Sequence, residues 1–276
     1  MQFRLMARPK LLAAILRPLF AVFALHLFGQ PAFAQENVER VETSGGDITR
    51  PSQRFDFRFE RESKPDERTT KLTLRYDHPV LLSHRWRLNL RMDVPFAWVN
   101  HRGEHDEEHA DTSGISDVLL HAVLAHYVKE NEGLAFGSEL IIPTAANESL
   151  GKGKWRLRPM AGYRWSLSQL GEDGFFQLIA RYDFSFAGKD SRSKVSELQF
   201  APNVEIDLGH SAYLSFYPSA DIRYDLVRDK LFVPVDIEVG KSFGRLVMSL
   251  EVAKAIVHED HAPYDWRAEG RIGMRF

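Results

Sequence analysis

Hydrophobic and polar residues alternate along most of this chain. In the segment from 84 to 96, for example, Trp86 and Leu88 alternate with Arg87 and Asn89. Side chains two residues apart lie on the same face of a β-strand, whereas a helix would mix the two sets. The alternation therefore predicts strands that each have one apolar face and one ionic face.

Twelve segments between residue 53 and residue 276 show this alternation, and connections separate them. They are residues 53 to 60, 70 to 78, 84 to 96, 115 to 127, 133 to 143, 154 to 166, 175 to 187, 196 to 207, 212 to 224, 230 to 240, 245 to 256 and 264 to 276. Strands of soluble proteins usually have about five or six residues, whereas tilted strands that cross a bilayer need about 9 to 11. The segment lengths therefore favour membrane-spanning strands.

The same alternation would also fit a soluble β-protein with its apolar faces in the core. Three features favour the inverted arrangement, in which the apolar faces point outward to lipid and the ionic faces point to the interior. Aromatic residues such as Trp98 and Trp165 sit near strand ends, where the two membrane interfaces would lie. Longer polar connections alternate with short ones, and the chain ends on an aromatic strand residue, Phe276, which resembles the assembly signal of bacterial outer-membrane proteins. We predict an all-β fold, a transmembrane antiparallel up-and-down β-barrel of about twelve strands, over residues 53 to 276; a soluble periplasmic β-protein is the alternative.

The first 34 residues have the layout of a secretory signal peptide: basic residues, an apolar run from 11 to 28, and an Ala-Phe-Ala triplet at 32 to 34. An uncleaved membrane anchor is the alternative, but Arg17 and Pro18 interrupt the run. A charge near the bilayer centre costs about 2.5 to 3.5 kcal/mol. We therefore predict a cleaved signal peptide and export to the bacterial outer membrane.

Residues 35 to 52 are polar, contain a Gly-Gly pair and show no apolar period, so they predict a flexible periplasmic N-terminal segment. Removing the leader would take away four of the 36 basic residues and no acidic ones, leaving 32 against 38. This balance gives no basic nucleic-acid footprint, and we predict no nucleic-acid partner. The absence of cysteine excludes disulfides, thiolate metal sites and cysteine nucleophiles.

A series of short motifs recurs in order over residues 70 to 276. They are Gly114-Ile115-Ser116-Asp117-Val118, Ile142-Pro143-Thr144, Leu150-Gly151, Gly153-Lys154-Trp155, then Leu157, Pro159, Gly162 and Tyr163, Ser185-Phe186-Ala187-Gly188, the spaced Leu198, Phe200 and Pro202, and Val239-Gly240-Lys241. Together they resemble the outer-membrane transporter family named for the meta-cleavage pathway of phenol degradation. The resemblance implies a barrel that takes up aromatic or other hydrophobic small molecules. Proline and glycine in these motifs are also what strand ends and loops require, so a structural role is expected for most of them.

The ionic faces of the twelve strands would line the barrel interior. The residues we predict there are Arg85, Arg87, Arg91, Asp93, Arg156, Arg158, Arg164, Arg181, Glu197, Glu205, Arg223 and Glu251. Guanidinium groups bind carboxylates in a bidentate manner and stack on aromatic rings, so these arginines could form a selective stretch. Each could equally pair with a neighbouring acid. Twelve strands lie between the filled eight-strand barrel and the open sixteen-strand porin, so a narrow conduit and a closed lumen both stay open.

A polar loop between two predicted strands holds His101, His105 and His109 among acidic residues. The spacing of His105 and His109 formally matches a zinc-peptidase pattern, which works only when a helix presents both rings on one face. The segment has no helical period. We therefore predict a solvated acidic loop that is at most a weak candidate for cation binding, with no metal centre and no cofactor.

We predict that the protein is not an enzyme, since the chain contains no G-x-S-x-G nucleophile elbow and none of its histidines begins an H-x-S pair. The predicted function is an outer-membrane channel or transporter for small aromatic or hydrophobic molecules. The alternatives are a structural or surface outer-membrane protein with a closed lumen and, less favoured, an outer-membrane lipid hydrolase. The expected partners are outer-membrane lipids, the barrel-assembly machinery and a small-molecule substrate.

Overall fold

The computed structural model describes residues 46–101, 111–129, 132–219, 221–258 and 262–276. Its strands are β1 (Arg54–Ser63), β2 (Glu67–Leu81), β3 (Trp86–His101), β4 (Thr112–Ile115), β5 (Val118–Lys129), β6 (Glu132–Ile142), β7 (Lys154–Ser166), β8 (Phe175–Gly188), β9 (Ser196–Gly209), β10 (Ala212–Phe216), β11 (Ile222–Asp225), β12 (Lys230–Phe243), β13 (Leu246–Val257) and β14 (Trp266–Arg275). Two 3-10 turns, η1 (Glu148–Leu150) and η2 (Ser168–Leu170), lie in connections. Among the described residues no helix has the length and apolar character needed to cross a bilayer.

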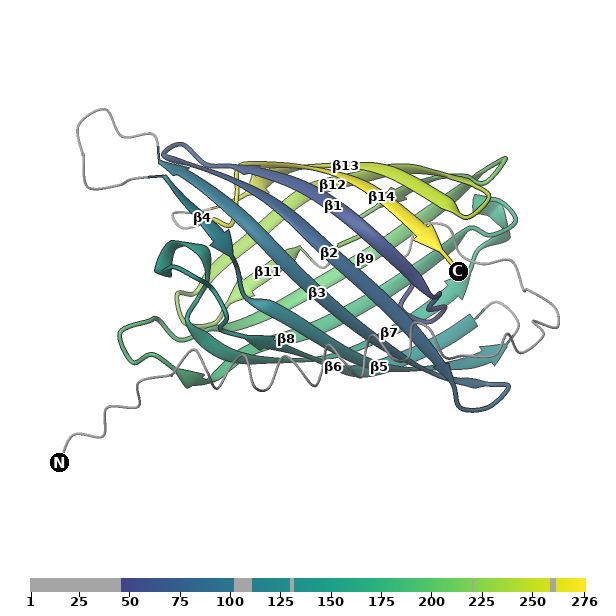
Figure 1. Ribbon diagram of the computed structural model, residues 1–276. Coiled ribbons are helices and arrows are strands. Elements are labelled where there is room, and N and C mark those ends of the chain that lie inside the picture. Colours follow the sequence, from purple (N-terminus) through teal and green to yellow (C-terminus); the bar gives the residue numbers. More distant parts are fainter. Residues whose placement is uncertain (1–45, 102–110, 130–131, 220, 259–261) are drawn as a thin grey trace. The chain divides into compact units, whose positions relative to one another are not determined.

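The strands form one closed antiparallel barrel (Figure 1). Strand β1 pairs with β2 on one side and with β14 on the other, through ten residue pairs that run from Arg54–Arg275 to Ser63–Trp266. Both β4 and β5 pair with β3, and both β10 and β11 pair with β9 and β12. Each of these two couples is therefore a single barrel strand with an interruption. The prediction of a twelve-strand up-and-down barrel is confirmed.

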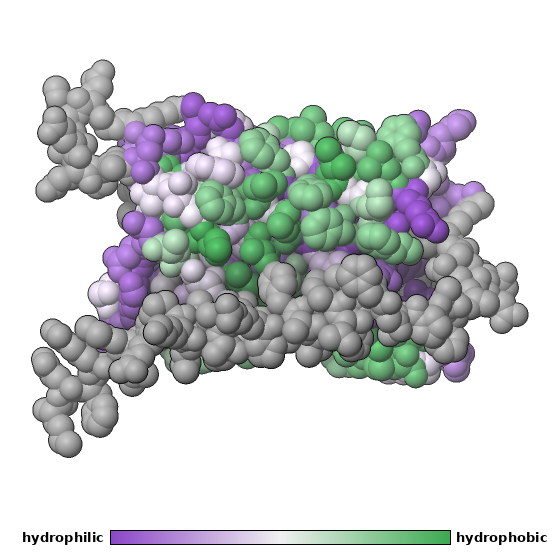
Figure 2. Space-filling model, in the orientation of Figure 1, coloured by the Kyte–Doolittle hydropathy of each residue, from purple (hydrophilic) through white to green (hydrophobic). Residues whose placement is uncertain are grey.

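The outer surface of the barrel is apolar across its middle. Phe59 on β1, Leu250 on β13 and Ile272 on β14 each expose more than half of their surface. In Figure 2, hydrophobic residues cover the middle of the visible face and hydrophilic residues gather at both ends. The outward tryptophans Trp98 and Trp165 lie near strand ends. This is the band and girdle pattern of a barrel surrounded by lipid.

The inner surface is the polar one. Asp56, Glu139, Gln177, Asp183 and Asn203 are at most 1% exposed, although none of them is apolar. The buried apolar groups inside are mostly small, and one cluster consists of Val123, Ala125, Ala135, Met160, Ile179 and Ala201. The predicted assignment of faces is therefore confirmed: the ionic side of the strands points inward, and ion pairs take the place of an apolar core.

The two interruptions depart from the predicted strands at 115 to 127 and 212 to 224. In the first, Asp117 leaves the ladder because its carboxylate accepts hydrogen bonds from the backbone of the loop that follows β6. In the second, Pro218 has no N–H to give to a ladder, and the chain turns into the lumen between β10 and β11. Both strands are therefore shorter at these points than the alternation predicted.

Adjacent residues on β2 provide a test of the two faces. Leu74 points outward and Thr73 lines the interior cavity. We expect Leu74→Arg to destabilise the folded barrel in lipid by about 2 to 4 kcal/mol, because the charge must be desolvated in the bilayer. Thr73→Arg should cost much less, since its charge reaches water in the lumen. Unfolding of both variants in urea from liposomes measures the difference, and equal losses of stability would contradict the register.

Candidate functional site

A cavity of about 370 Å³ lies inside the barrel, and most of the residues that line it are charged. The basic residues of the wall are Arg58, Arg75, Arg91, Lys152, Arg156, Arg158, Arg181, Arg223, Arg267 and Arg271. The acidic ones are Glu60, Asp93, Asp183, Glu197, Asp221, Glu238, Glu251 and Glu269. Because side chains alternate between the two faces of a strand, the residues that one strand contributes to this wall are two positions apart. The lumen therefore holds charges of both signs with a small excess of positive ones.

One group of ion pairs is centred on Glu139 of β6, which has no solvent exposure. Its Oε1 accepts a hydrogen bond from Nη2 of Arg91 at 2.7 Å and lies 3.1 Å from Nδ1 of His121. Its Oε2 accepts from Nη1 of Arg158 at 2.9 Å, and Nη2 of Arg158 continues to Asp183 at 2.9 Å. The carboxylate is thus shared by two guanidinium groups, which holds β3, β6, β7 and β8 together from inside.

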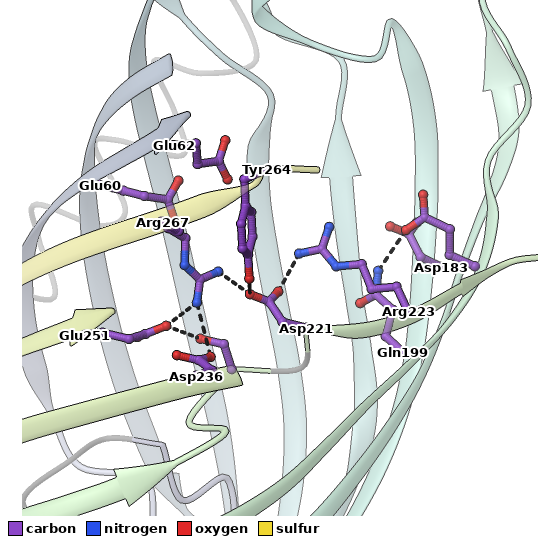
Figure 3. A network of polar contacts seen from close by, with 12 residues as sticks. Glu60, Glu62, Asp183, Gln199, Asp221, Arg223, Asp236, Glu251, Tyr264 and Arg267 are labelled. Atoms are coloured by element: carbon purple, nitrogen blue, oxygen red, sulfur yellow. Dashed lines mark hydrogen bonds and ion pairs between the residues drawn. The ribbon is translucent and has the colours of Figure 1, made fainter. Parts of the chain in front are cut away.

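A second group surrounds Arg267 of β14 (Figure 3). Its guanidinium donates to the carboxylates of Asp221 and Glu251. The hydroxyl of Tyr264 donates to Asp221 at 2.7 Å, and the Tyr264 ring lies 5.2 Å from the Arg267 guanidinium carbon. Arg223 of β11 donates to the other oxygen of Asp221. Three parts of the chain therefore meet at one buried carboxylate.

Asp221 belongs to the inward turn, which we define as residues 217–219 and 221 between β10 and β11. Tyr217 adopts a left-handed backbone with φ of 54°. Pro218 and Ser219 line the cavity, and the Ser219 hydroxyl donates to Glu251 at 3.3 Å. The turn narrows the lumen from one side. Pro218 was the sequence signal that could have indicated it, since proline cannot donate to a central strand ladder.

The lumen segment, residues 46–52, narrows the interior from another side. Oδ2 of Asp47 forms an ion pair with Nε of Arg164 at 2.8 Å, and its Oδ1 accepts from Nε2 of Gln177 at 2.8 Å. Thr49 donates to the same carboxylate through its backbone N–H and its hydroxyl, at 2.8 and 2.6 Å. Asp47 and Thr49 are buried. A single carboxylate thus fastens the segment to β7 and β8.

Glycines in the barrel wall make room for this segment. A Cβ atom on Gly162 would lie 2.8 Å from Cδ1 of Ile48, and one on Gly133 would lie 2.8 Å from Cβ of Thr49. The sequence predicted a flexible segment over residues 35 to 52. Within that range residues 46–52 pack against the inner wall, and residues 35 to 45 lie outside the described residues, as does the predicted signal peptide.

Eight of the twelve residues predicted to line the lumen do line the cavity. They are Arg91, Asp93, Arg156, Arg158, Arg181, Glu197, Arg223 and Glu251. Arg164 and Glu205 are buried inside the barrel but away from this cavity. Arg87 lies over the Tyr127 ring at 5.0 Å. The prediction was wrong for Arg85, which is exposed in the turn between β2 and β3, because the ladder of β3 begins only at the next residue.

The histidine loop contributes little to the described structure. His101 ends β3, whereas His105 and His109 lie outside the described residues. No group of three or more potential metal-ligating side chains occurs in the described part of the chain. Cation binding by this loop stays a prediction.

Sequence comparison identifies the family of this chain. The family model described as "Putative MetA-pathway of phenol degradation" matches residues 68–220, which is more than half of the chain. The chain belongs to this family. A comparison with curated proteins finds no match.

Solved structures share the fold. The COG4313 outer membrane channel from Pseudomonas putida F1 is 16% identical, with a TM-score of 0.66 over 88% of this chain and 100% of that chain. The NanC porin is 11% identical, with a TM-score of 0.51 over 80% of this chain and 98% of that chain. At these identities the likeness concerns the barrel fold.

The family motifs hold the long loop after β6. The carboxylate of Asp117 accepts from the backbone N–H groups of Ala145 and Lys152, at 3.3 and 2.9 Å. The Lys152 ammonium lines the cavity and donates to Glu197 at 3.1 Å. A hydrogen bond from Lys189 lowers the pKa of the exposed Glu148 carboxyl in the same loop. The motif residues thus shape the loop and bring one lysine to the cavity wall.

The attachment of the lumen segment can be tested with Asp47→Ala. This change removes the contacts of the segment with Arg164 and Gln177, and it removes two hydrogen bonds between Asp47 and Thr49 within the segment. We expect amide hydrogen exchange of residues 46–52 to rise at least about tenfold, while the barrel strands keep their protection. The matched control is Asp66→Ala, at an exposed position between β1 and β2, which should change nothing. Unaltered exchange in Asp47→Ala would contradict the proposed fastening.

The Arg267 group should contribute strongly to stability. Arg267→Gln leaves Asp221, Asp236 and Glu251 without the cation that they share. Breaking a buried ion pair by removing one partner costs about 3 to 5 kcal/mol. We expect a loss of this size in urea unfolding from liposomes, and almost none for Arg245→Gln at an exposed turn. Similar stabilities of the two variants would show that the network is not required.

Proposed function

We propose that the protein is a passive channel that admits small molecules through the bacterial outer membrane. The observation that carries the proposal is an ionic cavity of about 370 Å³ enclosed by a barrel whose outer surface is apolar. An apolar exterior suits acyl chains, and a charged interior keeps water within the barrel. Such an interior suits a channel, because hydrated solutes can cross the membrane through the water in the lumen, whereas the surrounding lipid excludes them.

The comparisons support the same proposal. The family is described by a pathway of phenol degradation, and the similar protein of Pseudomonas putida F1 is called an outer membrane channel. The NanC protein is called a porin. These names favour a non-enzymatic conduit over a lipid hydrolase. We extend the proposal to small aromatic molecules as the substrate class, on the strength of the family description.

The location in the outer membrane belongs to this proposal. The apolar band on the barrel supports insertion among outer-membrane lipids, and the barrel-assembly machinery is the partner that we propose for this insertion. A cleaved signal peptide over residues 1 to 34 would deliver the chain across the inner membrane. Edman sequencing of the mature protein should begin at Gln35, and a start at residue 1 would contradict the cleavage.

A closed lumen is the second candidate, and two segments of the chain favour it. The lumen segment and the inward turn both occupy the interior, where Ile48 and Ser219 line the same cavity. A barrel narrowed in this way could be shut at rest. The two candidates differ in one measurable property, which is the flow of ions through the isolated protein.

Planar bilayers test the proposed function directly. We expect the purified barrel to produce discrete ion-conducting steps, and Asp47→Ala to produce larger ones because it frees the lumen segment. Asp66→Ala should match the unaltered protein. Silence of all three proteins would reject the channel and favour a structural role, whereas steps seen only with Asp47→Ala would assign a closed resting state.

A further inference from the structure

Arg181 on β8 is unusual among the basic residues of the cavity wall. The other nine each form an ion pair with a carboxylate, as in the bidentate pair of Arg75 with Asp93 at 2.9 and 2.7 Å. No such pair joins Arg181 to any carboxylate in the described part of the chain. Its Nε is buried and has no hydrogen-bond partner. Arg181 therefore brings to the cavity a positive charge that no carboxylate of the described residues contacts directly.

The strand register explains why Arg181 has no partner. It lies opposite Met160 on β7 and Gln199 on β9, so neither neighbouring strand supplies an acid at its level. The acid whose charge acts on it most strongly is Glu139. That carboxylate already accepts hydrogen bonds from Arg91 and Arg158.

The surroundings of Arg181 increase its attraction for an anion. The positive charges of Arg75, Arg91 and Arg158 also act on it. Like charges in a low-dielectric wall raise the local positive potential, and a guanidinium holds a carboxylate through two parallel hydrogen bonds. A bound anion would supply the partner that the protein itself does not provide.

An apolar surface adjoins this cation. Ile179 lies two residues before Arg181 on β8, hence on the same face, and it borders the cavity although only 1% of its surface is exposed. Ile48 of the lumen segment packs against the cluster that contains Ile179 and also lines the cavity. A ligand that fits both features has an anionic end and an apolar body.

We propose that Arg181, with Ile179 and Ile48, forms a subsite for small organic carboxylates that carry an apolar or aromatic group. This inference rests on the proposed function, because it names the solute that the channel prefers. Binding at the subsite is nevertheless separate from conduction. The carboxylate of the solute forms the ionic contact with Arg181. A neutral or cationic molecule of the same shape cannot form this contact.

Equilibrium dialysis of the full mature barrel in detergent measures binding without requiring conduction. The probes are benzoate, benzyl alcohol as a neutral analogue, and benzylamine as a cationic one. We expect benzoate to bind more tightly than both. Arg181→Gln should weaken benzoate binding at least about tenfold, since a hydrogen bond to a charged group is lost. Arg181→Lys keeps the positive charge but cannot donate two parallel hydrogen bonds. Its affinity for benzoate should lie between those of the unaltered protein and Arg181→Gln.

Two matched variants separate the subsite from general effects. Arg245→Gln removes a charge outside the lumen and should leave benzoate binding unchanged. Ile48→Ala should weaken the binding of benzoate more than that of acetate, and this test does not depend on the folding of an Arg181 variant. Equal binding of benzoate and benzyl alcohol, or unchanged benzoate binding in Arg181→Gln, would overturn the inference. A barrel that conducts but does not bind benzoate refutes the subsite alone, whereas one that binds benzoate in a silent bilayer refutes the channel alone.

Discussion

The structure depends on one constraint: a backbone surrounded by lipid has no water to satisfy its N–H and C=O groups. Pairing of β1 with β14 satisfies it by closing the sheet. Closure then determines where side chains go, because alternate residues must point either to lipid or to the enclosed interior. Residues such as Phe59 and Leu250 face outward, and the charged residues have only the lumen left. The inverted distribution of polarity is thus a consequence of the closed backbone.

Ion pairs perform inside this barrel the task that apolar packing performs in a soluble protein. Glu139 joins four strands, and Arg267 joins β14 to the inward turn and β13. A buried charge is costly unless it is paired, so these groups are strongly coupled to one another. Arg181 departs from this rule in a cavity that is open enough for a ligand. A departure of this kind from an otherwise balanced wall is more informative about function than the paired arginines around it.

Two segments set the width of the lumen. The lumen segment is fastened through Asp47, and the inward turn through Asp221. Both use one carboxylate with several donors, so each attachment is strong but depends on a single residue. One family motif residue, Asp117, orders the loop that carries Lys152, at the end of the barrel opposite the C-terminal residue Phe276. Barrel strands therefore provide the wall, and short irregular segments decide how much of the interior stays empty.

The sequence by itself determined the number of strands and the two faces of each strand, because a period of two is a local property that each strand displays independently. It also placed eight of the twelve predicted lumen residues on the cavity wall. It did not determine the path of residues 46–52, since a polar segment acquires its position only from Arg164 and Gln177, which are distant in the chain. Only the tertiary structure decided which charges are paired. Ion pairing depends on the stagger between neighbouring strands, and that stagger left Arg181 beside Met160 and Gln199 without an acid of its own.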